Sequence, residues 1–187
     1  MKVLGHELPP LLESELRGGR PTLGPDRLAA LKPRLARSGL SNVYPVQIAH
    51  ERDERIKRLA GKIDRVLVDA PCTGLGSLRR RPESRWRRTP ADLPPLTRLQ
   101  RELLVAALRA VRPGGVVAYV TCSPHIVETQ VTVTEGARRS GVDVDFVDAR
   151  PLLPPGMPKL GPGPTVQLWP HRHGTDAMFL AVLRRTA

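Results

Sequence analysis

Aromatic residues and cysteines are scarce in this chain of 187 residues. It has two residues each of tryptophan, tyrosine, phenylalanine and cysteine. With so few aromatic rings, a core must be built mainly from leucine, valine, isoleucine and alanine. Two cysteines cannot supply the framework of a disulfide-rich secreted protein, and the first residues lack the charged start and apolar run of a signal peptide. We therefore expect a cytoplasmic protein with free thiols.

Long apolar runs and acidic residues are also in short supply. No run approaches the roughly 20 apolar residues that a membrane span requires. Lysine and arginine number 30 against 18 acidic residues, which gives a formal net charge of +12. This excess favours a polyanionic partner, either a nucleic acid or an acidic membrane surface. A codon bias toward arginine in a GC-rich genome would produce the same excess, so charge alone leaves the partner open.

The chain is long enough for one domain with a sizeable core. Residues 1–25 are punctuated by proline and glycine, including Pro9–Pro10 and Gly18–Gly19, so we expect an irregular segment there. The pattern then becomes regular, and leucines at helical spacing over Asp26–Ser38 predict a surface helix. We therefore place the folded domain at residues 26–187.

A strand, a helix and a second strand follow one another in the middle of the chain. Asp64–Pro71 has the valine and leucine run typical of a strand buried on both faces of a parallel sheet, and Val116–Thr121 has a similar run. Between them, a leucine-rich face predicts a helix that ends at the turn Arg112–Gly115. Such a crossover places both strands in one parallel sheet. Cys72 and Cys122 lie beyond the carboxyl ends of these strands, where reactive groups collect, so neighbouring strands would bring the two thiols together.

The remaining elements are shorter. The pattern predicts strands at Val43–Ala49, Val142–Val147 and Ala177–Leu183, a helical turn within His50–Leu59, a helix over Ile126–Arg139, and a proline- and glycine-rich loop over Leu152–Gly163. This alternation of strands and helices is typical of an α/β fold.

Two motifs carry the cysteines. One is Asp69–Gly76, which holds Cys72, and the other is Thr121–Ser123, which holds Cys122. Together they resemble motifs IV and VI of the Nop/Sun (Fmu) family of RNA cytosine-C5 methyltransferases. The resemblance runs over about 28–185. It also includes Leu78–Arg80, Arg85–Arg87, Arg112–Gly115, Leu168–Pro170 and His173–Asp176.

The resemblance implies a fold, a cofactor and a reaction. The fold is a partial Rossmann-like class I S-adenosylmethionine-dependent methyltransferase fold, with a mostly parallel sheet flanked by helices. In the reaction, Cys122 adds to C6 of cytosine so that C5 can take the methyl group, and Cys72 assists release of the product. Asp69 is implied to bind the amidine edge of the base, and Asp69 and Pro71 to lie against the cofactor S-adenosyl-L-methionine. The implied substrate is RNA, with ribosomal RNA as the family-level expectation.

A basic stretch follows the first motif directly. Arg79, Arg80, Arg85 and Arg87 surround one aromatic residue, Trp86. Guanidinium groups bind backbone phosphates and an aromatic ring stacks on a base, so we predict that these five residues contact RNA. The alternative is a solvated basic loop with its tryptophan packed in the core. The same arginines are candidates for the positive charge that would make the nucleophilic thiol a thiolate at neutral pH.

Two histidine patterns raise other chemistries. His171 and His173 form a His-x-His pair, but no cysteine or acidic cluster of suitable spacing accompanies them, so we expect no bound metal. His125 follows Cys122 closely, which raises a thiol hydrolase as a third hypothesis. No third group that would orient this histidine accompanies the pair.

The sequence also departs from the family's pattern. Thr129 stands where the family commonly has asparagine, and Ala177 and Met178 stand where it commonly has glycine and phenylalanine. Residues 1–25 contain neither a strand with the family's glycine-rich cofactor turn nor an acid-tipped second strand. We therefore expect a catalytic domain that is truncated at its N-terminus and lacks its first strands, with apolar sheet surface exposed. An inactive RNA-binding remnant of such an enzyme is the alternative.

Overall fold

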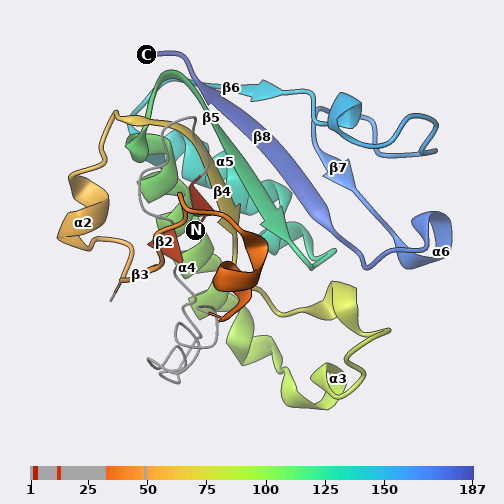
Figure 1. Cartoon of the computed structure of the whole chain (residues 1–187). Coiled ribbons are helices and arrows are strands. Elements are labelled where there is room, and N and C mark those ends of the chain that lie inside the picture. Colours follow the sequence, from red (N-terminus) through yellow and green to blue (C-terminus); the bar gives the residue numbers. More distant parts are fainter. Residues whose placement is uncertain (1, 4–11, 14–32, 49) are drawn as a thin grey trace.

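The main layer of the structure is a six-stranded sheet (Figure 1), seen in a computed structural model that describes residues 2–3, 12–13, 33–48 and 50–187. The strand order is β1-β4-β5-β8-β6, with β7 paired to β8. These strands are β1 Lys2–Val3, β4 Ile63–Asp69, β5 Val111–Thr121, β6 Val144–Val147, β7 Val166–Gln167 and β8 Phe179–Arg185. A separate parallel pair joins β2 Leu12–Glu13 to β3 Val46–Gln47.

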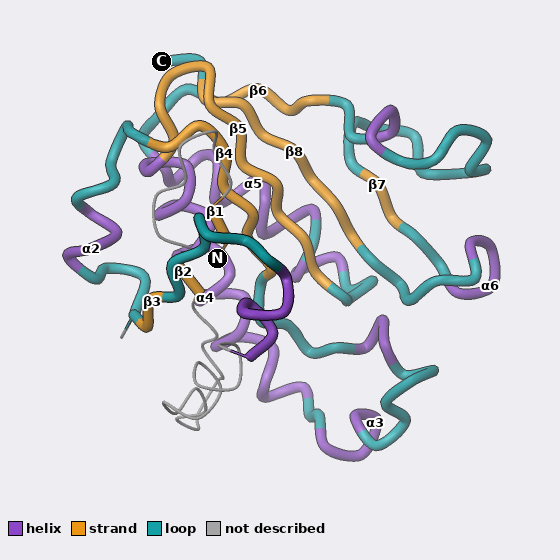
Figure 2. Tube along the Cα trace, in the orientation of Figure 1, coloured by secondary structure: helices purple, strands orange, loops and turns teal. Residues whose placement is uncertain are grey.

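The two longest helices lie side by side on one face of this sheet (Figure 2). They are α4 Leu93–Ala110 and α5 Gln130–Ser140, which pack on each other. The short helices are α2 Glu54–Lys57, α3 Ser84–Arg87 and α6 Pro170–His173, with a helical segment at 33–38 and 3-10 turns η1 Leu75–Ser77, η2 Pro90–Asp92, η3 Ile126–Glu128 and η4 Arg150–Leu152. In the part of the chain that the structure describes, no helix is long and apolar enough to cross a membrane.

The predicted strand-helix-strand unit is confirmed, except that β5 begins at Val111, so Arg112–Gly115, predicted as a turn, lies within the strand. β4 and β5 pair in parallel, with Asp69 opposite Val120, and α4 connects them. Strand β8 is antiparallel to β5, and β6 and β7 are each antiparallel to β8, so β4, β5, β6 and β7 share one direction. The sheet is therefore mixed. The α/β fold class is as predicted, and four strands share one direction, but β8 is antiparallel to its neighbours β5 and β6, and β1 is antiparallel to β4.

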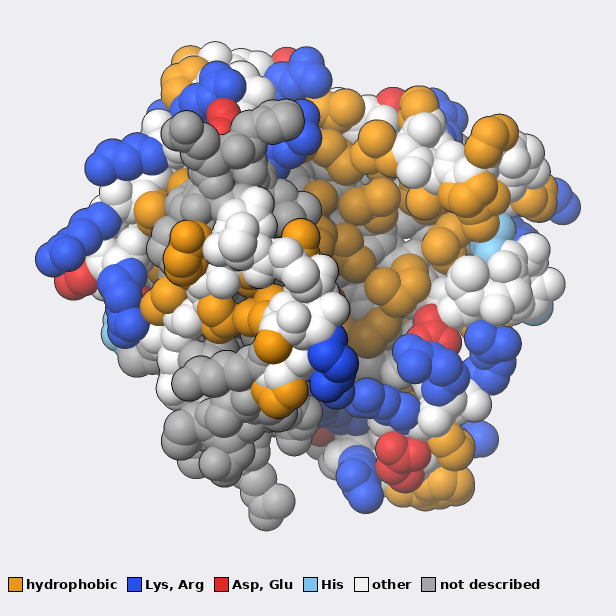
Figure 3. All heavy atoms as spheres, in the orientation of Figure 1, with side chains coloured by type: hydrophobic (Ala, Val, Ile, Leu, Met, Phe, Trp, Pro, Cys, Tyr) orange, Lys and Arg blue, Asp and Glu red, His pale blue; other side chains and the backbone are white. Residues whose placement is uncertain are grey.

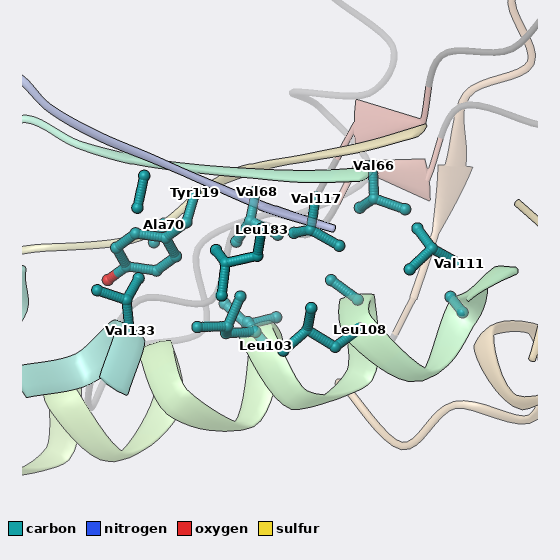
Figure 4. Packing of buried hydrophobic residues seen from close by; sticks show 14 of the residues in the cluster. Val66, Val68, Ala70, Leu103, Leu108, Val111, Val117, Tyr119, Val133 and Leu183 are labelled. Carbon is teal, nitrogen blue, oxygen red and sulfur yellow. The ribbon is translucent and has the colours of Figure 1, made fainter. Parts of the chain in front are cut away.

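The burial of β4 differs from the prediction. The sequence predicts burial on both faces, yet Val66 and Val68 are buried while Asp69 is exposed. Figure 4 shows Val66 and Val68 facing α4, which explains their burial. On the opposite face, Leu67 and its β5 partner Ala118 are only half-buried. Figure 3 shows apolar side chains gathered in a hollow on that side of the molecule, in agreement with the expected exposure of apolar sheet surface.

The core lies between the buried face of the sheet and the α4–α5 pair. Gly136 of α5 brings the two helices close, because a Cβ atom there would lie 2.7 Å from Cδ2 of Leu104. On the sheet side, the rings of Tyr119 and Phe179 meet edge to face with centroids 6.4 Å apart. Other members of this core are Ile63, Val66, Val68, Leu103, Ala107, Leu108, Val117, Val133, Ala181 and Leu183.

The N-terminal predictions are only partly within the described residues. Residues 1–25 were predicted to be irregular, but Lys2–Val3 and Leu12–Glu13 form two-residue strands, and the rest of that segment lies outside the described residues. An open strand edge pairs readily with an extended segment that reaches it, as β1 does along β4. The predicted helix over Asp26–Ser38 is described from residue 33 and is helical to residue 38. The strand predicted over Val43–Ala49 is reduced to β3, and residue 49 is not described.

The helix predicted over Ile126–Arg139 is interrupted near its start. Thr129 has φ −116° and ψ −100°, which is not helical, and its hydroxyl donates to the carbonyl of His125 at 3.0 Å. This local hydrogen bond competes with the helix and separates η3 from α5. The helical turn predicted within His50–Leu59, the strand at Val142–Val147 and the last strand are confirmed as α2, β6 and β8 with shifted ends.

Truncation of Leu104 should destabilise the fold strongly, because this side chain is fully buried between α4 and α5. We expect Leu104→Ala to lower the free energy of unfolding by about 2–5 kcal/mol, from lost burial and the cavity left behind. Leu152→Ala serves as the control, because Leu152 is 66% exposed, and it should change stability by no more than about 0.5 kcal/mol. Urea denaturation followed by circular dichroism measures both, and equal effects would contradict this placement of the core.

Candidate active site

The two cysteines meet at the carboxyl ends of β4 and β5. The backbone N–H of Ala70 donates to the carbonyl of Val120 at 2.9 Å, so the chain continues beside β5 after β4 ends. The Sγ atoms of Cys72 and Cys122 are 3.4 Å apart, which is hydrogen-bond distance for sulfur. The predicted meeting of the two thiols is therefore confirmed by the parallel pairing of their strands.

Gly76 allows the backbone of the first motif to pack closely against the backbone of the second. Its N–H donates to the carbonyl of Cys122 and its carbonyl accepts from the N–H of Ala177, each at 2.9 Å. A Cβ atom at Gly76 would lie 2.1 Å from the Ala177 oxygen and 2.7 Å from the Cys122 oxygen. Glycine is therefore required at this position by the close approach of the chain's own backbone.

The two thiols differ in their electrostatics. The hydrogen bond from Cys72 lowers the pKa of Cys122 to about 7, although burial, Asp69 and Asp176 oppose this shift. The hydrogen bond to Cys122, burial and the nearby charge of Glu128 hold the pKa of Cys72 well above its usual value. Cys72 therefore keeps its proton and donates it toward the Cys122 sulfur. The sequence pointed to arginines as the source of thiolate stabilisation, whereas the largest favourable effect comes from the second thiol.

A buried carboxylate that the sequence analysis did not select joins the two motifs. Glu128 is 0% exposed. Its Oε1 accepts from the N–H of Thr73 at 2.8 Å and from Nε2 of Gln100 at 3.0 Å. Its Oε2 accepts from the hydroxyls of Thr73 and Ser123, each at 2.5 Å. The signal in the sequence was an acid shortly after the second motif, but its partners lie as far as 55 positions away in the chain.

The residues implied for the cofactor lie on the open side of this site. Asp69 is exposed at the end of β4, and its charge acts on Cys122, so the two are close in space. Pro71 is half-buried, and its carbonyl accepts from Nε2 of Gln100 at 2.8 Å. An exposed carboxylate such as Asp69 is the type of group that pairs with the cationic amino group of S-adenosylmethionine. Among the described residues, the strand beyond β4 is the two-residue β1, which brings no glycine-rich turn to this edge.

The basic stretch over 79–87 has two parts, of which the first, Arg79 and Arg80, contacts the segment before β8. Nε of Arg80 donates to both carboxylate oxygens of Asp176, at 3.1 and 2.9 Å. Nη2 of Arg80 donates to Oδ2 of Asp176 at 2.5 Å. This ion pair lowers the pKa of Asp176. Nη2 of Arg79 donates to the carbonyl of Gly174 at 3.2 Å. Arg79 and Arg80, which are both predicted to contact RNA, therefore also connect their loop to the segment before β8.

The second part of the basic stretch projects outward. α3 carries Arg85, Trp86 and Arg87, all exposed, and Trp86 is 78% exposed. The alternative that packs this tryptophan in the core is therefore wrong. Figure 3 shows lysine and arginine side chains gathered on the side of the molecule where α3 lies in Figure 1. In the described ranges, the side chains of Arg85 and Arg87 form no hydrogen bond or ion pair.

Both ring nitrogens of His173 and the Nδ1 of His125 form hydrogen bonds with backbone groups. His173 accepts from the N–H of Trp169 through Nδ1 at 2.9 Å, and its Nε2 lies 2.8 Å from the carbonyl of Pro158 and donates to it. Neither ring nitrogen then has a lone pair free for a metal. Nδ1 of His125 accepts from the N–H of Val127 at 3.3 Å. The described contacts join His125 to its own turn and not to Cys122, which gives the thiol-hydrolase hypothesis no support.

The reactivity of Cys122 should follow its ionisation. Because a thiolate is the nucleophile, alkylation by iodoacetamide should rise with pH and reach half its maximum at about pH 7. In Cys72→Ala the hydrogen bond that lowers the pKa of Cys122 is lost, so the midpoint should rise toward about 8.5, the value of a free thiol. Mass spectrometry of the Cys122 peptide follows the rate. A wild-type midpoint near that of a free thiol, or no shift in Cys72→Ala, would contradict the assignment.

Comparison with known proteins places this site in a family. The family model described as 16S rRNA methyltransferase RsmB/F matches residues 23–184. The chain is 55% identical over 163 residues to the putative methyltransferase Rv1407 of Mycobacterium tuberculosis, covering 85% of this chain and 35% of that protein. It is 31% identical over 164 residues to a tRNA (cytosine(72)-C(5))-methyltransferase of Pyrococcus horikoshii, covering 86% of this chain and 38% of the relative.

Solved structures agree with this relation. NSun6 from Pyrococcus horikoshii, crystallised with SFG, superposes with a TM-score of 0.73 at 30% identity, over 88% of this chain and 40% of that one. The chain thus spans about a third of the length of the curated relatives named above. Because the family model matches most of its residues, the chain belongs to the RsmB/F family of 16S rRNA methyltransferases.

Proposed function

We propose that this chain contributes the catalytic thiols of an S-adenosylmethionine-dependent methyltransferase that acts on C5 of cytosine in RNA, with ribosomal RNA as the substrate. The observation that carries the proposal is the pair of thiols 3.4 Å apart at the ends of two parallel strands. The names of the relatives support an RNA substrate, since they include rRNA and tRNA cytosine methyltransferases. Both cysteines are free thiols, and a reducing cytoplasm would keep them so.

Cys122 is the nucleophile in this proposal. Cytosine C5 is a weak nucleophile, and addition of a thiolate to C6 converts the ring into an enamine whose C5 is reactive. Cys122 suits this role because its pKa of about 7 leaves a substantial thiolate fraction at neutral pH. S-Adenosylmethionine supplies an electrophilic methyl group when bound. Asp69, exposed beside Cys122, accepts hydrogen bonds from the amidine edge of the base or from the amino group of the cofactor, and Pro71 borders the same side.

Cys72 serves the second half of the reaction. After methylation, the proton on C5 must leave and the bond between Cys122 Sγ and C6 must break. Cys72 lies next to Cys122 and holds its proton firmly, so it returns that proton to the Cys122 sulfur as this thiolate departs. The electron pair of the C5–H bond forms the C5–C6 double bond as the bond to Cys122 Sγ breaks, and the C5 proton passes to the Cys72 sulfur directly or through water. Both cysteines then end as neutral thiols, and Cys122 becomes a thiolate again when it releases its proton to solvent.

α3 and the loop before it form the proposed RNA contact. Arg85 and Arg87 offer guanidinium groups to backbone phosphates, and Trp86 offers a ring face for stacking. Arg79 and Arg80 add positive charge, and they also hold the loop to Gly174 and Asp176. RNA would then cross this surface to reach the thiols.

A non-catalytic RNA-binding role is the second candidate. It is favoured by the neighbourhood of β4, where the described residues supply Asp69 and Pro71 but no glycine-rich turn after a strand. On this view, the α3 surface binds RNA and the thiols do no chemistry. Calorimetric titration with S-adenosylmethionine separates the two candidates, because only the methyltransferase requires saturable binding of the methyl donor.

Methyl transfer should depend on the two cysteines in different ways. With labelled S-adenosylmethionine and an unmodified rRNA transcript, Cys122→Ala should abolish transfer, since the thiol that remains, Cys72, has a raised pKa and stays protonated. Cys72→Ala should still methylate but should retain RNA in a covalent adduct that survives denaturing electrophoresis. Leu152→Ala, changed at an exposed position, is the control and should transfer normally. Transfer that persists in Cys122→Ala would contradict the assignment, and no transfer together with no donor binding would favour the second candidate.

RNA affinity should depend on the outward-facing arginines. Removing two phosphate contacts in Arg85→Ala/Arg87→Ala should weaken binding and lower the slope of log affinity against log salt by about 1.4, at about 0.7 for each contact with single-stranded RNA. Arg58→Ala/Arg138→Ala removes the same charge at exposed positions in other elements and should leave the slope unchanged. Fluorescence anisotropy over a salt series measures both, and equal slopes in the two double variants would remove α3 from the interface.

A further inference from the structure

Glu128 is the most completely enclosed acidic group in the described residues. It lies in η3, is 0% exposed, and accepts four hydrogen bonds at its two carboxylate oxygens. Its backbone is fixed as well, because its carbonyl accepts from the hydroxyl of Tyr119 at 2.9 Å and its N–H donates to the carbonyl of His125 at 2.9 Å. The proposed chemistry gives this carboxylate no role.

The four donors come from the segments that carry the thiols and from the helix between them. Thr73, which follows Cys72, supplies its N–H and its hydroxyl. Ser123, which follows Cys122, supplies its hydroxyl. Gln100 in the middle of α4 supplies Nε2, and the same nitrogen donates to the carbonyl of Pro71, one position before Cys72. A single carboxylate therefore connects both cysteine loops to the rigid helical layer.

The stability of these hydrogen bonds to Glu128 depends on the positions of the two cysteine loops. A carboxylate removed from water is costly unless its oxygens are satisfied, and hydrogen bonds to a charged acceptor are about twice as strong as neutral ones. Movement of either loop by about 1 Å would stretch at least one of these bonds beyond useful range. Besides the thiol pair itself and a 3.4 Å contact between the hydroxyls of Thr73 and Ser123, the loops are joined by the hydrogen bond from Gly76 N–H to the carbonyl of Cys122. That contact lies four positions beyond Cys72, whereas the Glu128 contacts lie next to both cysteines.

We propose that Glu128 is a positioning residue, whose buried carboxylate holds the Cys72 and Cys122 loops at the spacing at which one thiol donates to the other. It acts through Thr73 and Ser123 and does not touch the substrate. This inference rests on the proposed function for its purpose, since the spacing matters to a reaction in which both thiols take part. The spacing itself is a property of the protein without RNA or cofactor, and it is measurable there.

The test uses two thiol readouts on the full chain. The first is the pH midpoint of Cys122 alkylation by iodoacetamide. The second is the equilibrium constant for exchange with glutathione, in which the protein dithiol and one oxidised glutathione give the protein disulfide and two reduced glutathiones. This constant measures how closely the two thiols are held. A purely structural role for Glu128 would lower stability and leave both readouts in the folded protein unchanged.

Glu128→Gln keeps the shape of the side chain but replaces one acceptor oxygen with an NH2 group that faces donors. We expect the midpoint to rise from about 7 toward about 8.5, because Cys72 no longer donates to Cys122. We expect the exchange constant to fall about tenfold, the usual scale for loss of one charge-assisted hydrogen bond. Glu135→Gln is the matched control. It makes the same change in α5, where Glu135 pairs with Arg101 and Arg139, and it should alter neither readout.

Two milder variants keep the test decisive if Glu128→Gln does not fold. Thr73→Val and Ser123→Ala each remove one hydroxyl donor and leave the carboxylate in place. Each should shift both readouts in the same direction. A midpoint still near 7 and an exchange constant within about twofold of wild type, in folded Glu128→Gln or in both hydroxyl variants, would overturn the proposal.

The outcomes separate this inference from the proposed function. Neither readout involves RNA or the methyl donor. A failure of wild-type protein to transfer methyl groups would therefore count against the proposed function and leave the positioning role standing. Unchanged thiol readouts in Glu128→Gln would count against the positioning role alone.

Discussion

The parallel pairing of β4 with β5 is the constraint on which the rest of this site depends. Asp69 and Val120 are register partners, so the chain leaves both strands at the same height and each cysteine falls within a few residues of that edge. A shift of one residue would send the buried valines of β4 to the open face and turn the loop away from Cys122. The helix α4 makes the pairing possible, because it spans the crossover and fills the buried face with leucine. Packing of the leucine face of α4 thus brings the two cysteine loops to the same edge of the sheet.

Above this apolar layer lies a small polar one. Gln100 and Glu128 are both 0% exposed, and they satisfy each other and the two cysteine loops. Buried polar groups of this kind are costly when unpaired and rigid when fully paired. The same helix therefore contributes twice, through leucines that bury the sheet and through one glutamine that reaches the ends of the strands. The active-site edge is held by hydrogen bonds with defined directions, where apolar packing alone would leave the loops free to slide.

Local sequence patterns predicted the elements but not their surroundings. The valine run of β4, the leucine face of α4 and the two cysteine motifs were sufficient to place strand, helix, strand and thiols. The open face of β4 was not predicted, because a run of valine and leucine is the same whether one or two layers cover it. Glu128 and the Arg80–Asp176 pair were missed as structural links, because their partners are far apart in the chain. Such pairs follow from tertiary folding and leave no periodic signal.

The unequal pKa values of the two thiols follow from their position in the fold. The hydrogen bond with Cys122, its deeper burial and the charge of Glu128 raise the pKa of the Cys72 thiol, while Cys122 lies toward the open side. On that side Asp69 and Asp176 both oppose ionisation of Cys122. Asp176 is already paired with Arg80, whereas Asp69 is exposed and has no charged partner among the described residues. A cation that binds Asp69 would therefore weaken the opposition and favour the Cys122 thiolate. The carboxylate of Asp69 would in this way link the binding of a cationic group on the open side to ionisation of the Cys122 thiol.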